Sequence, residues 1–386
     1  MAEQSNEATE AAVAAARAFA EGHVVAAAAD WELARRFPVE LLPVAGEAGL
    51  LGLMAPPTEG GRGLGLTGTA AVAEVLAAAD MGIAFSLKVH ANFTASIARI
   101  GSPLQRERYL ADMLAGRRIG AFLLTEPDVG SDATKIRTQA RRTASGWVLS
   151  GEKAWTTNGV AAGLMQVFAQ TDPSLGWRGI ASFLVEGDTA GVERLPAYGL
   201  LGAYGAGVCG IRLHDVTVGE DALFLAPGDA FKGAMRGINI ARVGVAAMCT
   251  GMMASALDHA LRATVARSAF DQAIADFQGV QWMLADAATD LEAARLLTRE
   301  AARAFDADED AVVACAHAKK FAARAAWKAI SDCMQVMGAR GFRLDDGHPL
   351  ARHLAAARMT HWLDGATEIQ NVVIARELLR PYRAAG

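Results

Sequence analysis

The chain has 386 residues, of which 52% are hydrophobic and 20% are charged, and its formal net charge is −5. These values exclude a disordered chain and a polyelectrolyte, and the length predicts two or three domains. No dense run of Lys and Arg is present, which argues against binding to nucleic acid.

The first residues, "MAEQSNEATE", are acidic and polar, and we expect neither a secretory signal nor a membrane-spanning segment. The eight histidines form no metal-binding motif, so we expect no metal site. Four cysteines lie far apart without a CxxC pair, which is typical of reduced thiols in a cytoplasmic protein: Cys209, Cys249, Cys315 and Cys333.

Residues 1–121 have the apolar spacing of helices, for example in residues 8–25 and 69–80, with breaks at segments rich in Pro and Gly. One break contains "GLGLTG" (63–68), which matches the GxGxxG dinucleotide fingerprint. That motif needs a preceding strand, and Pro56–Pro57 cannot pair in a central strand. We therefore interpret the glycines as a loop.

The composition changes at residues 122–225. This region contains short segments rich in Val, Ile, Phe and Trp, which predict strands: "GWVLSGEKAWT", "LMQVFAQT", "GIASFLVE" and "VCGIRLHDVTV". From residue 226 to residue 386 the helical period returns, with one buried face predicted at Val280, Leu284, Ala287, Leu291, Ala294 and Leu297. The sequence thus predicts a mostly α, α+β protein in which a middle β domain (122–225) separates two helical domains (1–121 and 226–386).

The segment that says most about function is residues 121–159, which contains "TEPDVGSD" and ends with "GWVLSGEKAWTTNG". Small and hydroxyl residues form a loop that a planar ligand can approach, and an aromatic followed by two hydroxyls ends the next strand. The order of these residues closely resembles the flavin-binding β domain of the acyl-CoA dehydrogenase family. The alternative from composition alone is an ordinary β-loop-β unit with a core tryptophan.

Four further segments are similar to the same family, in the same order: residues 37–65, 267–278, 335–342 and 364–378. The resemblance implies a β-barrel-like middle domain, a C-terminal four-helix bundle and a non-covalent FAD. It also implies a homotetramer, because residues 267–278 match a segment that reaches the FAD of a neighbouring subunit.

The resemblance implies which residues hold the FAD. The flavin ring would be lined by Phe122, Leu124, Thr125, Gly130 and Ser131, with Trp155 and Thr157 on the ring face away from the substrate. A neighbouring subunit's FAD would be reached by Arg267, Phe270, Ile274 and Gln278, with Gln335 and Gly338 over its adenosine part. Glu368 completes the predicted cofactor residues, and Ser131, Arg242 and Gly365 would bind the substrate.

The chain departs from the family pattern at several positions. Asp271 replaces a glycine and puts a negative charge near the expected diphosphate, and Ala339 replaces the second glycine of the segment 335–342. Ala355–Ala356 replaces an Arg-Asp pair.

Asp364, in "HWLDGATEIQ" (361–370), falls where most members of the family carry a glutamate base. By resemblance it removes a proton α to a thioester while hydride leaves the β carbon for flavin N5, with apolar walls from Trp362 and Leu363 raising its pKa. The alternative base position, Ala241, has no carboxylate. Local chemistry alone favours a different interpretation, because Asp-Gly is a common turn dipeptide.

Aspartate is one methylene shorter than glutamate, which implies a repositioned loop, a substrate carried deeper or a different reaction. A different reaction would point to the nitroalkane oxidases of the same superfamily, which use an aspartate base. They also carry an arginine seven residues after that base, whereas this chain has Asn371 there. A family-like scaffold without activity is a further alternative.

We expect an acyl thioester on CoA or on an acyl-carrier protein as substrate, and an electron-transfer flavoprotein or similar carrier as electron acceptor. The acyl tail is expected beside residues 86–94, "SLKVHANFT". Four polar residues reduce the apolar character of that stretch: Ser86, His90, Asn92 and Thr94.

Overall fold

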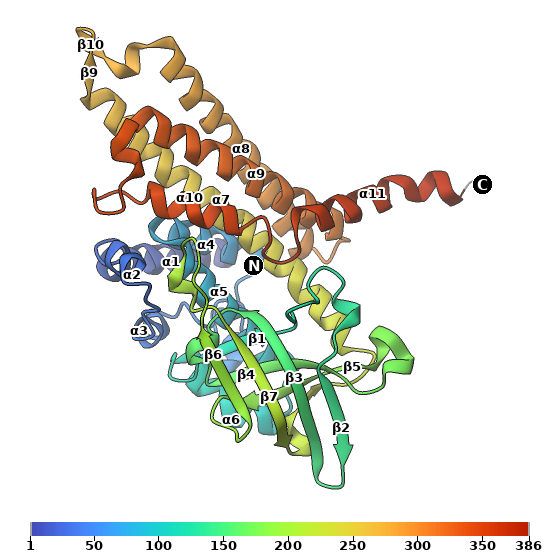
Figure 1. Ribbon diagram of the computed structural model, residues 1–386. Coiled ribbons are helices and arrows are strands. Elements are labelled where there is room, and N and C mark those ends of the chain that lie inside the picture. Colours follow the sequence, from blue (N-terminus) through green and yellow to red (C-terminus); the bar gives the residue numbers. More distant parts are fainter. Residues whose placement is uncertain (1, 385–386) are drawn as a thin grey trace.

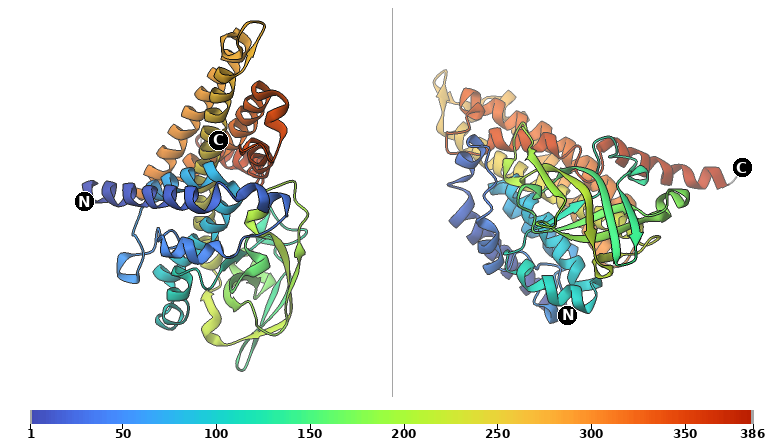
Figure 2. Two further views of the ribbon diagram at one scale, coloured as in Figure 1. Left: turned by 90° about the vertical axis from the view of Figure 1, so that its left-hand side faces the viewer. Right: turned by 60° about the horizontal axis from the view of Figure 1, so that its bottom comes forward.

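The computed structural model describes residues 2–384 of the chain, with the side chains of residues 6–383. A helical N-terminal part, a twisted sheet and a long helical bundle follow one another along the chain (Figure 1). The sheet lies at one end of the molecule, and the N-terminal helices fill the space between it and the bundle (Figures 1 and 2).

The N-terminal part is built from helices whose ends are set by capping side chains. Asp80 accepts a hydrogen bond from the backbone of Ile83 at the start of α5, and Ser102 forms a capping box with Gln105 at the start of α6. The helices are α1 (Ala2–Phe19), α2 (Ala28–Leu33), α3 (Leu41–Glu47), α4 (Leu66–Ala79), α5 (Met81–Ile100) and α6 (Pro103–Leu114).

The sheet has the strand order β6-β7-β3-β2-β4-β5-β8, with β1 added in parallel to β4. Every residue of β4 is buried, so this strand forms the middle of the sheet's core. The strands are β1 (Gly120–Leu123), β2 (Gln139–Thr143), β3 (Gly146–Thr156), β4 (Leu164–Gln170), β5 (Ile180–Glu186), β6 (Val192–Ala197), β7 (Cys209–Val218) and β8 (Leu223–Leu225).

The C-terminal part is a bundle whose helices pack closely through small residues, since most buried positions of α9 are alanines. α7 is long and apolar enough to cross a membrane by composition, but 72% of its most apolar window is buried inside the protein, as in a core helix. The elements are α7 (Ala230–Ala266), α8 (Gln278–Asp306), α9 (Val312–Met337), α10 (Leu350–Met359) and α11 (Thr367–Ala384), with a small hairpin of β9 (Ser268–Ala269) and β10 (Gln272–Ala273) between α7 and α8.

The fold class predicted from the sequence is confirmed: helical elements flank a middle sheet, and the C-terminal helices form a bundle. The loop interpretation of residues 63–68 is correct for Gly63 and Gly65 but wrong for Gly68, which lies in the first turn of α4. No strand precedes α4 among the described residues from Ala2 onward, and the first amides of α4, on Leu66 and Thr67, donate to the carboxylate of Asp306. The helix N-terminus that a dinucleotide would need is therefore already occupied by a protein carboxylate.

Candidate active site

The loop between α10 and α11 carries Asp364 in a left-handed turn. Asp364 has φ 51° and Gly365 has φ 93°, and a polar residue followed by glycine is the pair that adopts such angles at least cost. The turn interpretation of Asp-Gly is thus correct for the backbone. It does not describe the side chain.

Three buried donors from other elements hold this loop by its backbone carbonyls. Lys319 on α9 donates to the carbonyls of His361, at 3.0 Å, and Gly365, at 2.9 Å. Arg242 Nε on α7 donates to the carbonyl of Asp364 at 3.1 Å, and Gln370 Nε2 donates to Gly365 at 2.9 Å. The loop position is therefore set by the bundle rather than by its own turn.

Gly365 is required by these contacts as well as by its backbone angle. A Cβ added there would lie 3.2 Å from Arg242 Nη2 and 3.1 Å from Gln370 Nε2. A side chain at this position would push apart the donors that fix the loop.

The carboxylate of Asp364 is enclosed and incompletely bonded. Although the residue as a whole is partly exposed, its Oδ2 atom is buried and has no hydrogen-bond partner in the described part of the chain. Burial raises the pKa of Asp364 from 3.8 to about 6, and the nearby cations Lys319, Arg242 and Lys88 oppose the rise. At neutral pH this is an ionised carboxylate with an unused acceptor oxygen, which is what a proton acceptor requires.

The prediction that Trp362 forms an apolar wall of this site is wrong. Trp362 is 58% exposed and turns outward, where the Arg358 guanidinium lies 4.7 Å from its ring centroid. Leu363 packs against the main hydrophobic core, as a wall residue would. The remaining environment is cationic rather than apolar.

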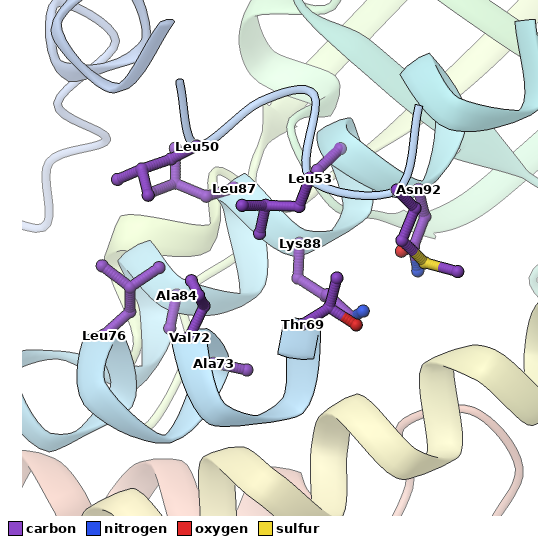
Figure 3. A pocket seen from close by; sticks show the side chains of 12 residues that line it. Leu50, Leu53, Thr69, Val72, Ala73, Leu76, Ala84, Leu87, Lys88 and Asn92 are labelled. Carbon is purple, nitrogen blue, oxygen red and sulfur yellow. The ribbon is translucent and has the colours of Figure 1, made fainter. Parts of the chain in front are cut away.

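A small cavity of about 20 Å³ lies between α4, α5 and the loop after α3 (Figure 3). Its lining is largely aliphatic, with three polar side chains: Thr69, Lys88 and Asn92. Lys88 is the functional candidate that sequence reasoning missed. The available signal was a lysine between Leu87 and Val89 in a mostly buried stretch of α5.

Most of the polar side chains that were expected to reduce the apolar character of an acyl pocket bond to the protein instead. Ser86 donates to Asn158 Oδ1 at 2.6 Å, and His90 Nδ1 accepts the backbone N–H of Gly120 at 2.9 Å. Thr94 donates to the carbonyl of His90. Ser86 and His90 thus join α5 to the β domain, Thr94 bonds within α5, and of the four only Asn92 lines the cavity.

The predicted flavin loop follows β1 and is anchored by a buried ion pair. Lys153 Nζ lies 2.9 Å from Glu126 Oε1 and also donates to the carbonyl of Leu124. The carbonyl of Thr125 accepts the amide of Ala154. These bonds hold residues 124–126 against β3 from behind.

The outer side of this loop is open. Phe122 packs on Phe168 with ring centroids 4.9 Å apart, while Gly130 and Ser131 are exposed, and a Cβ added at Gly130 would touch nothing within 4 Å. At the end of β3, Trp155 is 61% exposed with φ 57°, Thr157 is buried, and the buried hydroxyl of Thr156 has no partner in residues 6–383.

Comparison with known proteins accounts for this arrangement. Three models of one family match almost the whole chain: acyl-CoA dehydrogenase N-terminal domain (residues 6–117), middle domain (121–216) and C-terminal domain (228–379). The chain belongs to the acyl-CoA dehydrogenase family.

Relatives and solved structures agree with this assignment. The chain is 35% identical to the mitochondrial short-chain specific acyl-CoA dehydrogenase of Bos taurus, over 95% of the chain and 89% of that protein. It resembles butyryl-CoA dehydrogenase from Megasphaera elsdenii with a TM-score of 0.92 and 29% identity, over 96% and 98% of the two chains. For a glutaryl-CoA dehydrogenase from Mycobacterium smegmatis in complex with FADH2, these values are 0.90, 27%, 96% and 94%.

As a member of the acyl-CoA dehydrogenase family, the protein is an FAD-dependent oxidoreductase that dehydrogenates acyl-CoA thioesters. Its β domain fits the cofactor. Gly130 leaves open space, the hydroxyl of Thr156 has no partner among the described side chains, and the exposed Trp155 ring lies 4.8 Å from the Tyr198 ring. A flat aromatic ligand would supply the contacts that these groups lack.

The second set of predicted cofactor residues gathers at the far end of the bundle from the sheet (Figures 1 and 2). Arg267 ends α7, and its Nη1 lies 3.1 Å from where a Cβ of Gly338 would stand. The other members surround the hairpin and the end of α9: Phe270, Ile274, Gln278 and Gln335. Within one chain, these residues and the flavin loop do not come together.

Glu368 is exposed in the first turn of α11. It lies near the loop that carries Asp364, where its charge acts on the pKa values of Lys319 and His361. No contact of the described residues links it to the flavin loop.

Proposed function

We propose that Asp364 is the base that removes the α proton of an acyl-CoA substrate. The observation that carries this assignment is the enclosed, unbonded Oδ2 atom, on a loop that three buried donors fix in place. The chemistry that FAD would supply when bound is acceptance of the hydride that leaves the β carbon. The chain's own part is to hold the carboxylate, keep it ionised near neutral pH and exclude water around it.

Arg242 and Gly365 act in this proposal through the geometry of the loop and through one free donor. Arg242 uses Nε and Nη1 on the protein, with Asp364 and Asn239 as acceptors. Its Nη2 has no acceptor in the described chain and remains for substrate. Ser131, exposed on the flavin loop, is the third proposed substrate contact.

A repositioned loop is our explanation for the shorter side chain. Consecutive left-handed residues at 364 and 365, held by Lys319 and Arg242, place the carboxylate by backbone geometry as well as by side-chain length. The nitroalkane-oxidase alternative gains nothing from the structure, because Asn371 is an exposed, uncharged residue of α11.

We also propose a homotetramer in the cytoplasm that passes electrons to an electron-transfer flavoprotein or a similar carrier. Support for assembly comes from the separated cofactor residues and from large exposed apolar side chains on the bundle and its hairpin: Phe270, Trp282, Phe342, Leu378 and Tyr382. Light scattering tests the assembly, and a panel of CoA and carrier-protein thioesters tests the carrier of the acyl group.

Asp364→Asn tests the base. It keeps size and hydrogen bonding but removes basicity, so anaerobic flavin reduction by an acyl-CoA should fall by about a hundred- to ten-thousandfold with FAD still bound. Asp308→Asn is the matched control, because Asp308 also has a positive φ, 58°, but is exposed. A near wild-type rate in Asp364→Asn would make Asp364 a turn residue only.

The same variant should be more stable than the wild type at pH 7. With the pKa raised from 3.8 to about 6, the protonated form is favoured on folding, and that stabilisation is present below pH 3.8 and lost as pH rises through 6. The neutral amide of Asp364→Asn does not lose this stabilisation, so at pH 7 its free energy of unfolding should exceed that of the wild type by on the order of 2–3 kcal/mol. Denaturant unfolding at pH 7 measures this difference, and destabilisation would contradict the proposed environment.

A further inference from the structure

Lys88 is a buried cation to which no protein acceptor is bonded. The residue is 7% exposed, and no hydrogen bond or ion pair of Lys88 is found in residues 6–383. The other two buried lysines of that range are bonded, Lys153 to Glu126 and Lys319 to two carbonyls. A buried ammonium without a partner is costly unless water reaches it. Its nitrogen is not among the sealed, unpartnered atoms of the described side chains, so part of its surface meets open space.

The open space beside Lys88 is the cavity between α4, α5 and the loop after α3. Its volume of about 20 Å³ suits one water molecule, which needs two to four polar partners when it is buried. Lys88, Thr69 and Asn92 bring polar side chains to an otherwise aliphatic lining, and Figure 3 shows all three. Thr69 already donates its hydroxyl proton to the carbonyl of Leu66, so its oxygen is free to accept a hydrogen bond from water.

Lys88 also stands on the side of the cavity that faces α7 and the loop of Asp364. Gly244 on α7 makes room for the lysine, since a Cβ at that position would lie 2.6 Å from Lys88 Cε. Gly244 is two residues from Arg242, whose Nε donates to the carbonyl of Asp364 at 3.1 Å. Lys88 and Asp364 form no ion pair within 4.0 Å in the described chain. The ammonium therefore acts on the carboxylate through space and not through a direct bond.

We infer that the cavity holds one ordered water bonded to Lys88 and Thr69, and that the hydrated ammonium of Lys88 is a positioning charge that keeps the Asp364 carboxylate ionised. The consequence for catalysis rests on the proposed function, because it takes Asp364 as the base, whereas the water and the charge do not depend on it. The water replaces part of the solvation that the ammonium loses on burial, at a small entropic cost. Asn92 is the third polar group of the lining.

The electrostatic role of Lys88 differs from that of the other two cations around Asp364. Burial raises the pKa of Asp364 to about 6, and Lys319, Arg242 and Lys88 oppose the rise. Burial lowers the pKa of Lys88 to about 8, which leaves it mostly protonated at neutral pH. Lys319 and Arg242 also hold the loop by hydrogen bonds, whereas Lys88 does not, so removing Lys88 changes the charge and leaves those bonds in place. The other titratable groups near this loop interact with those two loop-holding cations: Cys249, Cys315, His361 and Glu368.

A crystal structure of the FAD-loaded protein tests the water. One ordered water should lie within hydrogen-bond distance of Lys88 Nζ and Thr69 Oγ1, and it should be lost in Thr69→Val, which keeps the shape of the side chain and removes the hydroxyl. Thr298→Val is the matched control and should keep the water, because Thr298 is also buried and donates to a carbonyl of its own helix at 2.7 Å. A dry cavity in the wild type would overturn the inference. So would a halide in its place, identified by anomalous scattering after a bromide soak, because an anion cancels the charge of Lys88.

Infrared titration of the Asp364 carboxyl group tests the charge without relying on turnover. The C=O band, assigned by its loss in Asp364→Asn, should have its midpoint near pH 6 in the wild type and about half to one pH unit higher in Lys88→Met and Lys88→Gln. Lys88→Arg should keep most of the wild-type value, and Lys232→Met, which removes an exposed lysine of α7, should keep all of it.

The outcomes separate this inference from the proposed function. An unchanged midpoint in Lys88→Met would overturn the role of Lys88, and so would a shift in Lys88→Met that Lys88→Gln does not share, because both variants remove the charge. The pH profile of flavin reduction is then measured in the same variants. If the Asp364 band shifts and the rate profile does not follow it, Asp364 is not the base, while the action of Lys88 on its carboxylate stands.

Discussion

The loop between α10 and α11 that carries the proposed base Asp364, here called the catalytic loop, and the β9–β10 hairpin differ in how far one chain completes them. The loop is closed inside the protein, with its carbonyls bonded to Lys319, Arg242 and Gln370. The hairpin presents its predicted cofactor groups outward, with Phe270 90% exposed at its tip. In our proposal, the base is thus a property of the folded chain, whereas full cofactor binding is a property of the assembly.

Breaking the support of the catalytic loop should have the largest effect. Lys319→Met removes both hydrogen bonds from Lys319 Nζ, and a shift of the carboxylate by about 1 Å lowers flavin reduction on the order of a hundredfold. Lys320→Met is the matched control, because this neighbouring lysine of α9 has neither contact.

The pH profile of Lys319→Met distinguishes positioning from general damage. Lys319 is the strongest of the three cations that lower the pKa of Asp364, so its removal should move the midpoint of the rate profile to higher pH. A reduced rate with an unchanged midpoint would assign Lys319 a structural role only.

Arg267→Ala should weaken FAD binding about ten- to hundredfold, because a guanidinium provides charge-assisted hydrogen bonds to phosphate. The catalytic loop should be unaffected, which the wild-type pH midpoint of the residual activity would show. Arg262→Ala is the control, since Arg262 is exposed on the same helix and pairs with Asp258 at 2.9 Å. Unchanged FAD affinity on dilution of Arg267→Ala would contradict the shared cofactor site.

In the wild type, flavin reduction should fall about tenfold for each pH unit below about 6. The base must be ionised, and the pKa of Asp364 is raised to about 6 by burial. Stopped-flow reduction between pH 5 and 8 measures this profile. A rate independent of pH in that range would exclude Asp364 as the titrating base.

The sequence predicts the regular elements well because their signals are local. Residues 146–156 read as a strand and form β3 with the same bounds, and the helix expected at residues 69–80 forms α4, which ends at Ala79. The Asp-Gly turn at 364 was likewise predictable from its dipeptide.

The environment of the site was not predictable in the same way, because it depends on contacts between distant elements. Trp362 was expected as a wall and instead stacks outward on Arg358. Lys88 meets Gly244, which lies 156 residues away, and nothing in the residues around either position indicates that contact. Periodicity assigns a buried face, but it does not say which buried polar group stays unbonded.

The smallest expected effect concerns the hairpin turn, and it separates backbone strain from charge. Phe270 and Asp271 have φ 55° and 63°, as in a two-residue type I′ turn, in which glycine is favoured at the second position. Asp271→Gly should raise the free energy of unfolding by about 0.5–1 kcal/mol at most, since aspartate tolerates this conformation better than most residues. It should also tighten FAD binding a few-fold by removing a negative charge near the partner's expected diphosphate. Asp271→Asn keeps the left-handed preference and removes the charge, so an equal gain in FAD affinity in both variants would assign the effect to electrostatics, and high salt should then reduce it. A gain in FAD affinity with glycine alone would assign it to the turn, and no gain in either variant would mean that the hairpin does not face a diphosphate.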